Sequence, residues 1–292
     1  MKLLRFQHGS DIHTGVLTAS DVTPIAAVNA SRGTQLRDDL LGLIEQAGAD
    51  GTSLEPLRDL RGVETIPLAE VRPLLPYQRP PKIWCIGLNY RSHAEDINAV
   101  QPEEPGSFMK PASCMFEPGG DIVLPPPEIS NDVDAEGELG VIIGRKCRFV
   151  PADSVREVIF GYTTTLDMTA LDVLRKNTRY LTRSKSIDTF FSFGPVVVTT
   201  DEVPDVDALE VITEHNGSVW SRDFVRNMRT GPFELVRFHS DYMTLFPGDL
   251  ISTGCPKGAR IKAGDRVRAR IDGVGALEAG VVQGRRVDYF KA

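Results

Sequence analysis

NDVDAEGELGVIIG, the stretch from Asn131 to Gly144, places two glutamates directly before an apolar run. The run Leu139–Ile143 is short and bounded by glycine, which is typical of a strand. Side chains at i and i+2 of a strand share a face, so Glu136 and Glu138 would lie about 6–7 Å apart. Two such carboxylates repel unless a cation lies between them, and oxygen donors suit Mg²⁺, Mn²⁺ or Ca²⁺ better than zinc. A solvent-exposed strand fits the same pattern, and this stretch alone leaves both interpretations open.

A third carboxylate, Asp167, follows the strand-like run Gly161–Leu166 and opens a helical pattern, Met168–Lys176. Ligands often bind where a strand ends and a helix begins, because free backbone N–H groups point there. Asp167 could equally be the N-cap of that helix. Spacing along the chain does not show whether the three carboxylates meet.

The composition excludes several classes of protein. The chain has 292 residues, of which 41% are hydrophobic and 25% charged, so it is globular and long enough for a sizeable core. A formal net charge of −7 disfavours a general nucleic-acid binder. No apolar run approaches the roughly 18 residues of a membrane helix, and Met1–Ser10 lacks a signal-peptide pattern. We therefore expect a cytoplasmic protein without nucleic-acid or membrane partners.

The first 72 residues are expected to form a small α+β N-terminal domain. Two strand-like runs, Lys2–Phe6 and Thr14–Leu17, precede a helical pattern at 31–46. Four prolines between residues 73 and 81 exclude a helix or a central strand there. Residues 73–82 are therefore predicted to be a linker, and residues 83–292 a larger second domain.

The larger part is rich in apolar or alternating runs bounded by Gly, Pro, Asp or Asn. We expect strands at 83–87, 120–124, 139–143, 160–167, 194–199, 209–214, 249–253, 266–271 and 275–282. Helical patterns are fewer, at 153–158, 167–176 and 232–243, and Asn216-Gly217 and Asp272-Gly273 predict hairpin turns. Because strands and helices do not alternate regularly, the predicted fold class is mixed β with few helices, not a doubly wound parallel sheet.

An ordered series of short motifs covers about residues 83–282. They include GLNYRSHA at 87–94, FMKP at 108–111, EGELGVIIG at 136–144, LDMTA at 166–170, SKSIDTF at 184–190, PGD at 247–249 and TGCPKG at 253–258. This series resembles the fumarylacetoacetate hydrolase superfamily, in particular its acylpyruvate hydrolase and oxaloacetate decarboxylase-like branch. The resemblance implies a catalytic domain built as a rolled β-sandwich or barrel, and usually a homodimer.

The resemblance also implies a metal site and a substrate. Glu136, Glu138 and Asp167 match the carboxylates that hold a divalent metal, commonly Mg²⁺, which a small anionic 2-oxo acid chelates. Three carboxylates and Mg²⁺ leave a formal charge of −1, so an anionic substrate needs cationic side chains nearby. Lys110 and Lys185 match family lysines that line such a site.

Further site residues follow from the same resemblance. Tyr162 and Thr253 are expected to contact the substrate. His93 matches the family's catalytic histidine, which pairs with an acid three residues on, here Asp96, to activate water or relay a proton. A carboxylate-oriented base with a pKa of about 7 suits that task. Helical i, i+3 spacing favours Asp96 over Glu95 as the partner of His93.

Besides Asp96, which stands where Glu is usual, three residues depart from the family pattern. Leu171 and Leu174 stand where Arg and Gln are frequent, and Cys255 where Thr is common. Leucines replace a bidentate carboxylate clamp by an apolar wall. If they border the pocket, as we expect, the distal part of the substrate carries less charge than usual or is held differently.

The expected activity is hydrolytic cleavage of a C–C bond in an acylpyruvate-type 2,4-dioxo acid, through an enolate stabilised by Mg²⁺, with Mn²⁺ or Ca²⁺ as alternatives. A decarboxylase, isomerase or hydratase of a 2-oxo acid could use the same metal site, and so could a non-catalytic metal-binding member. His93 favours hydrolysis, because a purely metal-assisted decarboxylase would not need it.

Overall fold

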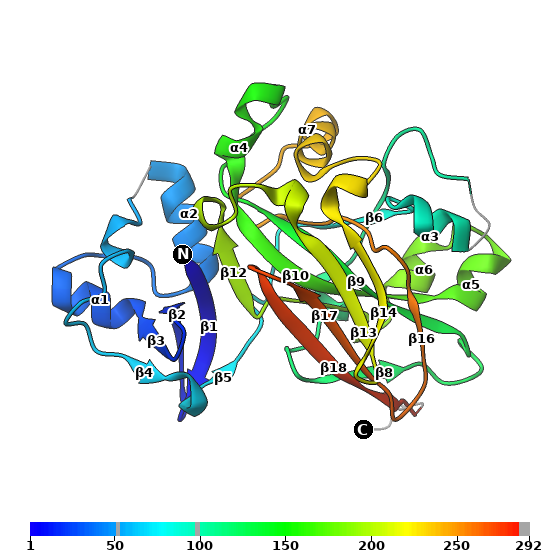
Figure 1. The fold of residues 1–292 in the computed structure, drawn as a ribbon, viewed down its shortest axis with the longest axis horizontal. Coiled ribbons are helices and arrows are strands. Elements are labelled where there is room, and N and C mark those ends of the chain that lie inside the picture. Colours follow the sequence, from blue (N-terminus) through cyan, green and yellow to red (C-terminus); the bar gives the residue numbers. More distant parts are fainter. Residues whose placement is uncertain (51–52, 97–99, 286–292) are drawn as a thin grey trace, which may run out of the picture.

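Two long antiparallel strands, β9 (Val133–Ile143) and β10 (Ile159–Ala170), form the centre of the molecule (Figure 1). The computed structural model describes residues 1–50, 53–96 and 100–285, and every residue of β9 in it is buried. A strand buried along its whole length must be covered on both faces. In the β9–β10 register, Glu136 lies opposite Asp167.

The first sheet contains thirteen strands. Neighbouring strands follow the order β4-β3-β2-β1-β12-β10-β9-β15-β6-β7. Three further strands lie off this path: β5 pairs with β1, β11 with β10, and β16 with β9. Besides β9 and β10, its strands are β1 (Lys2–His8), β2 (Asp11–Leu17), β3 (Asp21–Pro24), β4 (Ile66–Pro67), β5 (Arg72–Pro73), β6 (Ile83–Gly87), β7 (Gly106–Met109), β11 (Phe191–Phe193), β12 (Val196–Thr199), β15 (Leu250–Ser252) and β16 (Ala259–Ile261).

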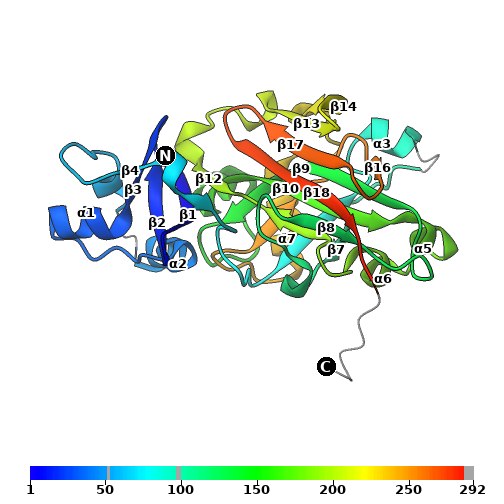
Figure 2. The same ribbon diagram turned by 90° about the horizontal axis from the view of Figure 1, so that it is seen from below.

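The second sheet covers one face of β9 and β10 (Figure 2). Its order is β14 (Ser218–Phe224), β13 (Glu210–His215), β17 (Arg266–Ile271), β18 (Gly275–Gln283) and β8 (Asp121–Leu124). The close approach explains Gly137, because a Cβ there would lie 2.6 Å from the Thr213 hydroxyl. In the described residues neither strand order returns to its start, so the predicted mixed β fold is confirmed as a sandwich of two open sheets.

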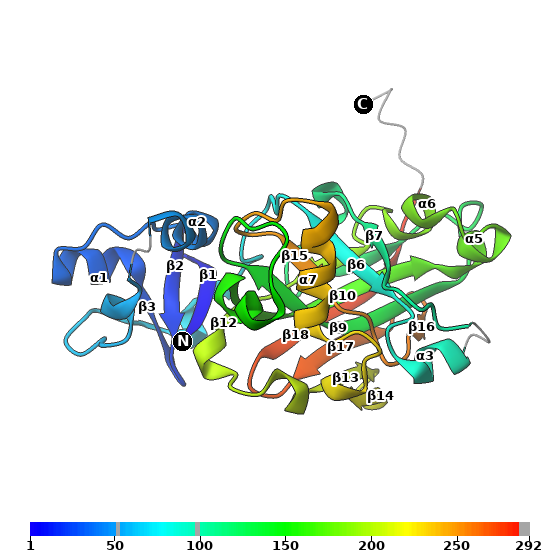
Figure 3. The ribbon, with the colours of Figure 1, turned by 90° about the horizontal axis from the view of Figure 1, so that it is seen from above.

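Few helices accompany the sheets. They are α1 (Ile25–Arg32), α2 (Leu40–Asp50), α3 (Arg91–Asp96), α4 (Val155–Val158), α5 (Leu171–Lys176), α6 (Leu181–Lys185) and α7 (Pro232–Tyr242). Figures 1 and 3 show α3, α5 and α6 at the end of the molecule farthest from the N-terminal strands. No helix in the described ranges is long and apolar enough to cross a membrane.

The N-terminal strands continue the first sheet, because β1 pairs antiparallel with β12. The predicted helix at 31–46 is correct only in its second half, where residues 40–46 belong to α2; α1 ends at Arg32, residues 33–39 are not helical, and Gly33 adopts the left-handed conformation with φ 67°. The Asn29 side chain then accepts hydrogen bonds from Thr34 and from the Leu36 backbone N–H. These local caps terminate the helix despite its continuing apolar periodicity.

The segment predicted as a linker, residues 73–82, is packed against both parts of the chain. The Leu74 backbone N–H donates to the Arg5 carbonyl at 2.9 Å, and that of Leu75 to Glu117 at 2.6 Å. The buried Tyr77 hydroxyl donates to the Gly248 carbonyl at 3.0 Å. The division into domains at this segment stays a prediction.

Candidate active site

Three carboxylates lie together on the face of the β9–β10 pair that points away from the second sheet. Glu136, Glu138 and Asp167 are 6%, 1% and 1% exposed, so the alternative of a solvated pair on an exposed strand is wrong. Glu136 and Glu138 share a face by their two-residue spacing. Asp167 joins them because it is the cross-strand partner of Glu136, and directly opposed side chains have Cβ atoms about 5 Å apart.

Asp167 is neither the end of a strand nor a helix cap. β10 continues through Ala170, and residues 168–170 pair with residues 133–135 of β9. The helix α5 begins only at Leu171. The helical pattern from residue 167 was therefore misleading, since pairing with β9 outweighs local periodicity at these three positions.

Lys185, the last residue of α6, joins the opposed carboxylates. Its Nζ donates to Glu136 Oε2 at 2.9 Å and to Asp167 Oδ2 at 3.0 Å. Burial opposes the ammonium charge, but the carboxylates of Asp167, Glu136 and Glu138 outweigh burial and hold the pKa of Lys185 well above its usual value. Lys185 therefore stays charged and offsets part of the negative charge of the cluster.

Lys110 directly follows β7 and contacts the other carboxylate oxygen of Asp167, Oδ1. Its Nζ forms an ion pair with Asp167 and donates to the carbonyls of Met168 at 3.1 Å and Phe190 at 2.5 Å. An ammonium has three N–H donors, and these three partners account for them. The side chain is 0% exposed, so Lys110 positions Asp167 and is not placed to contact a substrate.

Glu138 is held by Ser252 and Gly254, which no local sequence pattern predicts as site residues. The Ser252 hydroxyl donates to its Oε2 at 2.5 Å, and the Gly254 backbone N–H donates to the same atom at 2.9 Å. Gly254 has φ +94°, and a Cβ there would lie 2.9 Å from Asn89 Cβ, so only glycine fits. Burial, with the nearby charges of Asp167 and Glu136, raises the pKa of Glu138 to about 8.

The donor set fits a divalent cation. One ligand atom each from Glu136, Glu138 and Cys255 lies within 4.8 Å of the others, and Lys185 links Asp167 to the same cluster. Carboxylate oxygens are the donors that Mg²⁺ and Mn²⁺ prefer. Burial, reinforced by Glu136 and Glu138, raises the pKa of Cys255 well above its usual value, so the thiol is neutral at neutral pH. With all three carboxylates ionised, their charge exceeds that of Lys110 and Lys185, so a bound divalent cation would stabilise the ionised form of Glu138.

A pocket of about 310 Å³ opens from this cluster between β6, β7, α5 and α6. Its charged lining residues, Glu136 and Lys185, belong to the cluster, and Cys255 and Thr169 lie beside them. The rest of the lining is mainly apolar: Ile86, Leu88, Pro102, Phe108, Leu171, Leu174 and Leu181. Leu171 and Leu174 thus border the pocket, although Asp167 lies on a strand and not on their helix.

Two predicted substrate contacts lie elsewhere. Tyr162 is five residues from Asp167 on β10 and therefore points to the opposite face, where it is 2% exposed in an apolar cluster with Val211 and Ile271. Thr253 is fully buried, and its hydroxyl donates to the Leu139 carbonyl at 2.9 Å. Neither residue lines the pocket.

The predicted catalytic pair lies on α3, between β6 and β7 in sequence. The side chains of His93 and Asp96 are outside the part of the chain that the structure describes. Their neighbour Ser92 donates a hydrogen bond to the Pro256 carbonyl at 3.0 Å, which ties α3 to the loop after β15.

The buried side chain of Asn89 holds that loop in place through hydrogen bonds. Its Nδ2 donates to the carbonyls of Thr253 at 2.7 Å and Thr230 at 2.9 Å, and its Oδ1 accepts from the Thr230 N–H at 3.0 Å. Asn89→Ala leaves these buried groups unsatisfied and should lower the free energy of unfolding by about 3 kcal/mol. Urea unfolding measures this effect. The exposed Asn227→Ala is the control, and equal losses in both variants would contradict the role given to Asn89.

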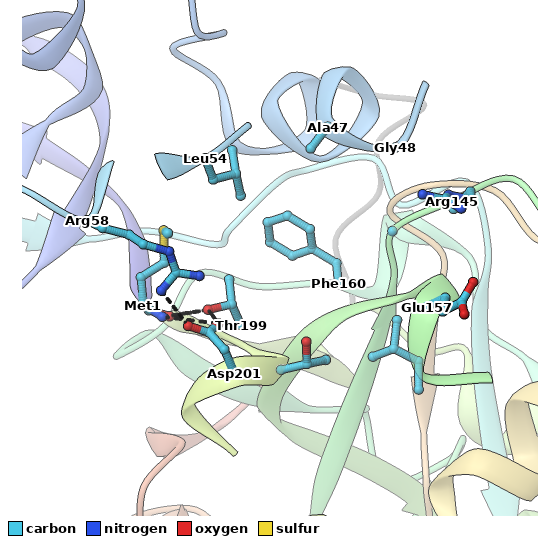
Figure 4. Close-up of a pocket in the computed structure, with 13 residues that line it drawn as sticks. Met1, Ala47, Gly48, Leu54, Arg58, Arg145, Glu157, Phe160, Thr199 and Asp201 are labelled. Atoms are coloured by element: carbon cyan, nitrogen blue, oxygen red, sulfur yellow. Dashed lines mark hydrogen bonds and ion pairs between the residues drawn. The ribbon is translucent and has the colours of Figure 1, made fainter. Parts of the chain in front are cut away.

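Figure 4 shows a different cavity, of about 270 Å³, between the N-terminal part and β10. Among its charged side chains, Arg58 pairs with Asp201 at 2.7 Å. Within the described residues, the only group of three close metal-ligating side chains is the one around Glu136 and Glu138. We therefore take the acidic pocket as the candidate active site.

Comparisons with known proteins found one matching family model and several similar sequences. Residues 82–282 match the family model described as fumarylacetoacetate (FAA) hydrolase C-terminal. A mitochondrial oxaloacetate tautomerase of Bos taurus is 32% identical over 290 residues, covering 95% of this chain and 90% of the relative. An uncharacterized protein of Methanocaldococcus jannaschii is 41% identical over 202 residues, covering 68% of this chain and 82% of that protein.

Solved structures are similar along nearly the whole chain. A maleylpyruvate hydrolase from a Sphingobium species, in complex with manganese(II) and pyruvate, has a TM-score of 0.79 and 31% identity and covers 98% of this chain and 100% of its own. A fumarylacetoacetate hydrolase from Exiguobacterium antarcticum has a TM-score of 0.82 and 29% identity, with 97% and 100% coverage.

Proposed function

Because this chain belongs to the fumarylacetoacetate hydrolase family, we propose that it is a divalent-metal-dependent hydrolase that cleaves a C–C bond in an acylpyruvate-type 2,4-dioxo acid. One observation carries the proposal: the buried carboxylates Glu136, Glu138 and Asp167 lie together, Lys185 links Glu136 to Asp167, and Glu136 and Lys185 line a pocket large enough for a small ligand. The solved relative that holds manganese and pyruvate supports this assignment.

The cluster supplies the means to bind and orient such a substrate. A divalent cation held by Glu136, Glu138 and Asp167 would act as a Lewis acid toward the 2-oxo group. Two N–H groups of Lys185 bond to Glu136 and Asp167, and the ammonium also lines the pocket. Its third N–H can therefore donate to the carboxylate of a 2-oxo acid.

Hydrolysis requires one water and a base. The water oxygen adds to the C4 carbonyl carbon, the C3–C4 bond breaks, and its electron pair remains on the pyruvate fragment until a proton returns to C3. His93 on α3 is our proposed base, oriented by Asp96. The apolar lining of the pocket keeps bulk water from the reacting carbons.

A panel of substrates tests the activity. We expect 2,4-dioxopentanoate to be converted into pyruvate and acetate in the presence of Mg²⁺ or Mn²⁺, with loss of activity in EDTA and recovery when metal is restored. Absence of metal-dependent turnover across a range of 2,4-dioxo and 2-oxo acids would contradict an enzymatic role and favour a metal-binding protein without catalysis.

A second candidate is keto–enol tautomerisation of a 2-oxo acid on the same site. The observation that favours it is the oxaloacetate tautomerase relative, which is similar over 95% of this chain. Tautomerisation moves a proton and leaves the carbon chain intact, so decay of the enol absorbance without formation of pyruvate would identify it. Decarboxylation would instead release CO₂ and pyruvate from oxaloacetate.

Replacing His93 separates hydrolysis from the reactions that need only the metal. If His93 activates water, His93→Ala should lower kcat for hydrolysis by about 10²–10⁴-fold, because this is the usual contribution of a general base. Mn²⁺ affinity, measured by calorimetry, should stay unchanged. Hydrolysis that persists in the variant would remove His93 from the mechanism, and His8→Ala, far from the pocket in sequence and fold, is the control.

A further inference from the structure

We infer that this pocket selects 2-oxo acids with a single carboxylate and an uncharged, apolar tail, and that Leu171, Leu174 and Leu181 determine this preference. The inference rests on the proposed function in one respect, since it places the 2-oxo acid end of the ligand at the acidic cluster. It goes further by assigning the chemistry of the distal end.

Charge is confined to one end of the pocket. Among the described residues that line the pocket, only Glu136 and Lys185 are charged. Lys185 Nζ lies 2.9 Å from Glu136 Oε2. The hydroxyl of Thr169, another polar lining residue, donates to Glu136 Oε1 at 2.7 Å. Both charged groups and the Thr169 hydroxyl therefore lie at the cluster where the 2-oxo acid end would bind, and the other polar side chains of the lining, Ser107 and Thr178, are uncharged.

The basic residues of the neighbouring helices do not serve the distal end. Arg175 at the end of α5 pairs with Asp132 at 2.5 Å and is exposed. The guanidinium of Arg183 on α6 lies 5.7 Å from the ring centre of Tyr180. Neither arginine is among the lining residues, nor are Lys176 and Arg179, so Lys185 is the one basic residue among the described lining residues. A second carboxylate in the pocket would thus lose water without gaining a counter-ion, which strongly disfavours its binding.

Apolar side chains form the walls instead. Leu171 and Leu174 are three residues apart on α5 and therefore share a helix face, and Leu181 adds to them from α6. Ile86 and Phe108 contribute from the paired strands β6 and β7. Such a lining gains free energy from each methylene that it removes from water.

Leu88, which also lines the pocket, has an unusual backbone conformation. Its φ of 57° lies in the left-handed region, which leucine rarely adopts. The strained backbone is held in part by Gln101, whose Nε2 donates to the Leu88 carbonyl at 3.1 Å. A glycine would avoid this strain, so the presence of a leucine side chain in the pocket lining has a conformational cost.

Binding of two ligands of equal chain length tests the inference without relying on turnover. 2-Oxohexanoate and 2-oxoadipate both have six carbons and differ in a terminal methyl against a terminal carboxylate. Calorimetry on the Mn²⁺-loaded protein should show 2-oxohexanoate binding at least about 10-fold more tightly. From 2-oxobutyrate to 2-oxohexanoate, each added methylene should tighten binding about fourfold.

Leu174→Arg should reverse the preference, because it places a cation where the terminal carboxylate of 2-oxoadipate would lie. Leu174→Met keeps an apolar side chain of similar volume and should retain the preference for 2-oxohexanoate. Tyr180→Arg adds the same charge nearby but outside the lining, and should also leave the preference unchanged. Unaltered Mn²⁺ affinity in all three variants shows that the cluster is intact.

Two outcomes are distinguishable. If wild-type protein binds 2-oxoadipate as tightly as 2-oxohexanoate or more tightly, the assigned specificity is wrong while the proposed function stands. If no 2-oxo acid binds the Mn²⁺-loaded protein, the proposed function fails and the specificity fails with it.

Discussion

Glu138→Gln is expected to weaken Mn²⁺ binding at least about 100-fold. Replacing a residue that only hydrogen-bonds a metal ligand already lowers metal affinity by about 10–100-fold, and this substitution removes a carboxylate that would bind the metal directly. Gln has nearly the same shape and can still accept hydrogen bonds from Ser252 and Gly254, which hold Glu138 Oε2 at 2.5 and 2.9 Å. The geometry of the cluster should therefore survive the substitution. Calorimetric titration of the metal-free protein with Mn²⁺ measures the effect.

The same variant should not destabilise the metal-free fold. Burial and the neighbouring carboxylates of Asp167 and Glu136 raise the pKa of Glu138 to about 8, which means that the environment disfavours its charge. A neutral Gln removes that penalty, so the free energy of unfolding should stay equal or rise. Glu278→Gln, at an exposed ion pair with Arg266, is the control for the chemical change. Mn²⁺ binding that survives Glu138→Gln would exclude Glu138 as a ligand.

Lys185→Met is expected to have the largest effect on stability. It leaves Glu136 and Asp167 directly opposed on adjacent strands without the ammonium that bonds to both. Removing one partner of a buried ion pair typically costs about 3–5 kcal/mol, and we expect a loss of that size in urea unfolding of the metal-free protein. Mn²⁺ should restore part of the loss, because the cation replaces some of the missing positive charge.

Lys176→Met is the matched control, because Lys176 is exposed on the neighbouring helix α5. Its free energy of unfolding should change by less than about 0.5 kcal/mol. Equal stability of the Lys185 and Lys176 variants would show that Lys185 does not hold the two carboxylates together. In the Lys185 variant, affinity for 2-oxohexanoate should also fall, since the pocket loses its cationic side chain.

The central strands could be predicted from local sequence because their pattern is simple. The short β-branched run after Glu138 and the two-residue spacing of the glutamates place both carboxylates on one face, as the structure shows. The burial of that face could not be derived from spacing. It depends on elements from distant parts of the chain, such as α6, which supplies Lys185.

Errors arose where tertiary contacts outweigh local pattern. Asp167 was expected at a helix start, but its neighbours up to Ala170 pair with β9. Tyr162 was carried over from a motif, although an odd spacing from Asp167 on one strand already places it on the other face. Because side chains alternate between the two faces of a strand, this spacing alone excludes Tyr162 from the face that carries Asp167.

Other site residues left little local signal. Ser252 and Gly254 bind Glu138 from β15 and the turn after it, more than 100 residues along the chain. Their roles follow from the pairing of β15 with β9, which no sequence period reveals. Leu171 and Leu174 were identified only as departures from a family pattern, and the pocket now gives them a physical role as its apolar wall.

The most direct test is a crystal structure of this protein soaked with Mn²⁺ and oxalate, a mimic of the pyruvate enolate. The account predicts an anomalous peak for Mn²⁺ within ligand distance of carboxylate oxygens from Glu136, Glu138 and Asp167. It further predicts both oxalate carboxylates on the metal and Lys185 in contact with oxalate. Manganese bound elsewhere, or oxalate absent from this pocket while Mn²⁺ occupies it, would contradict the assignment of this cluster as a site for 2-oxo acid chemistry.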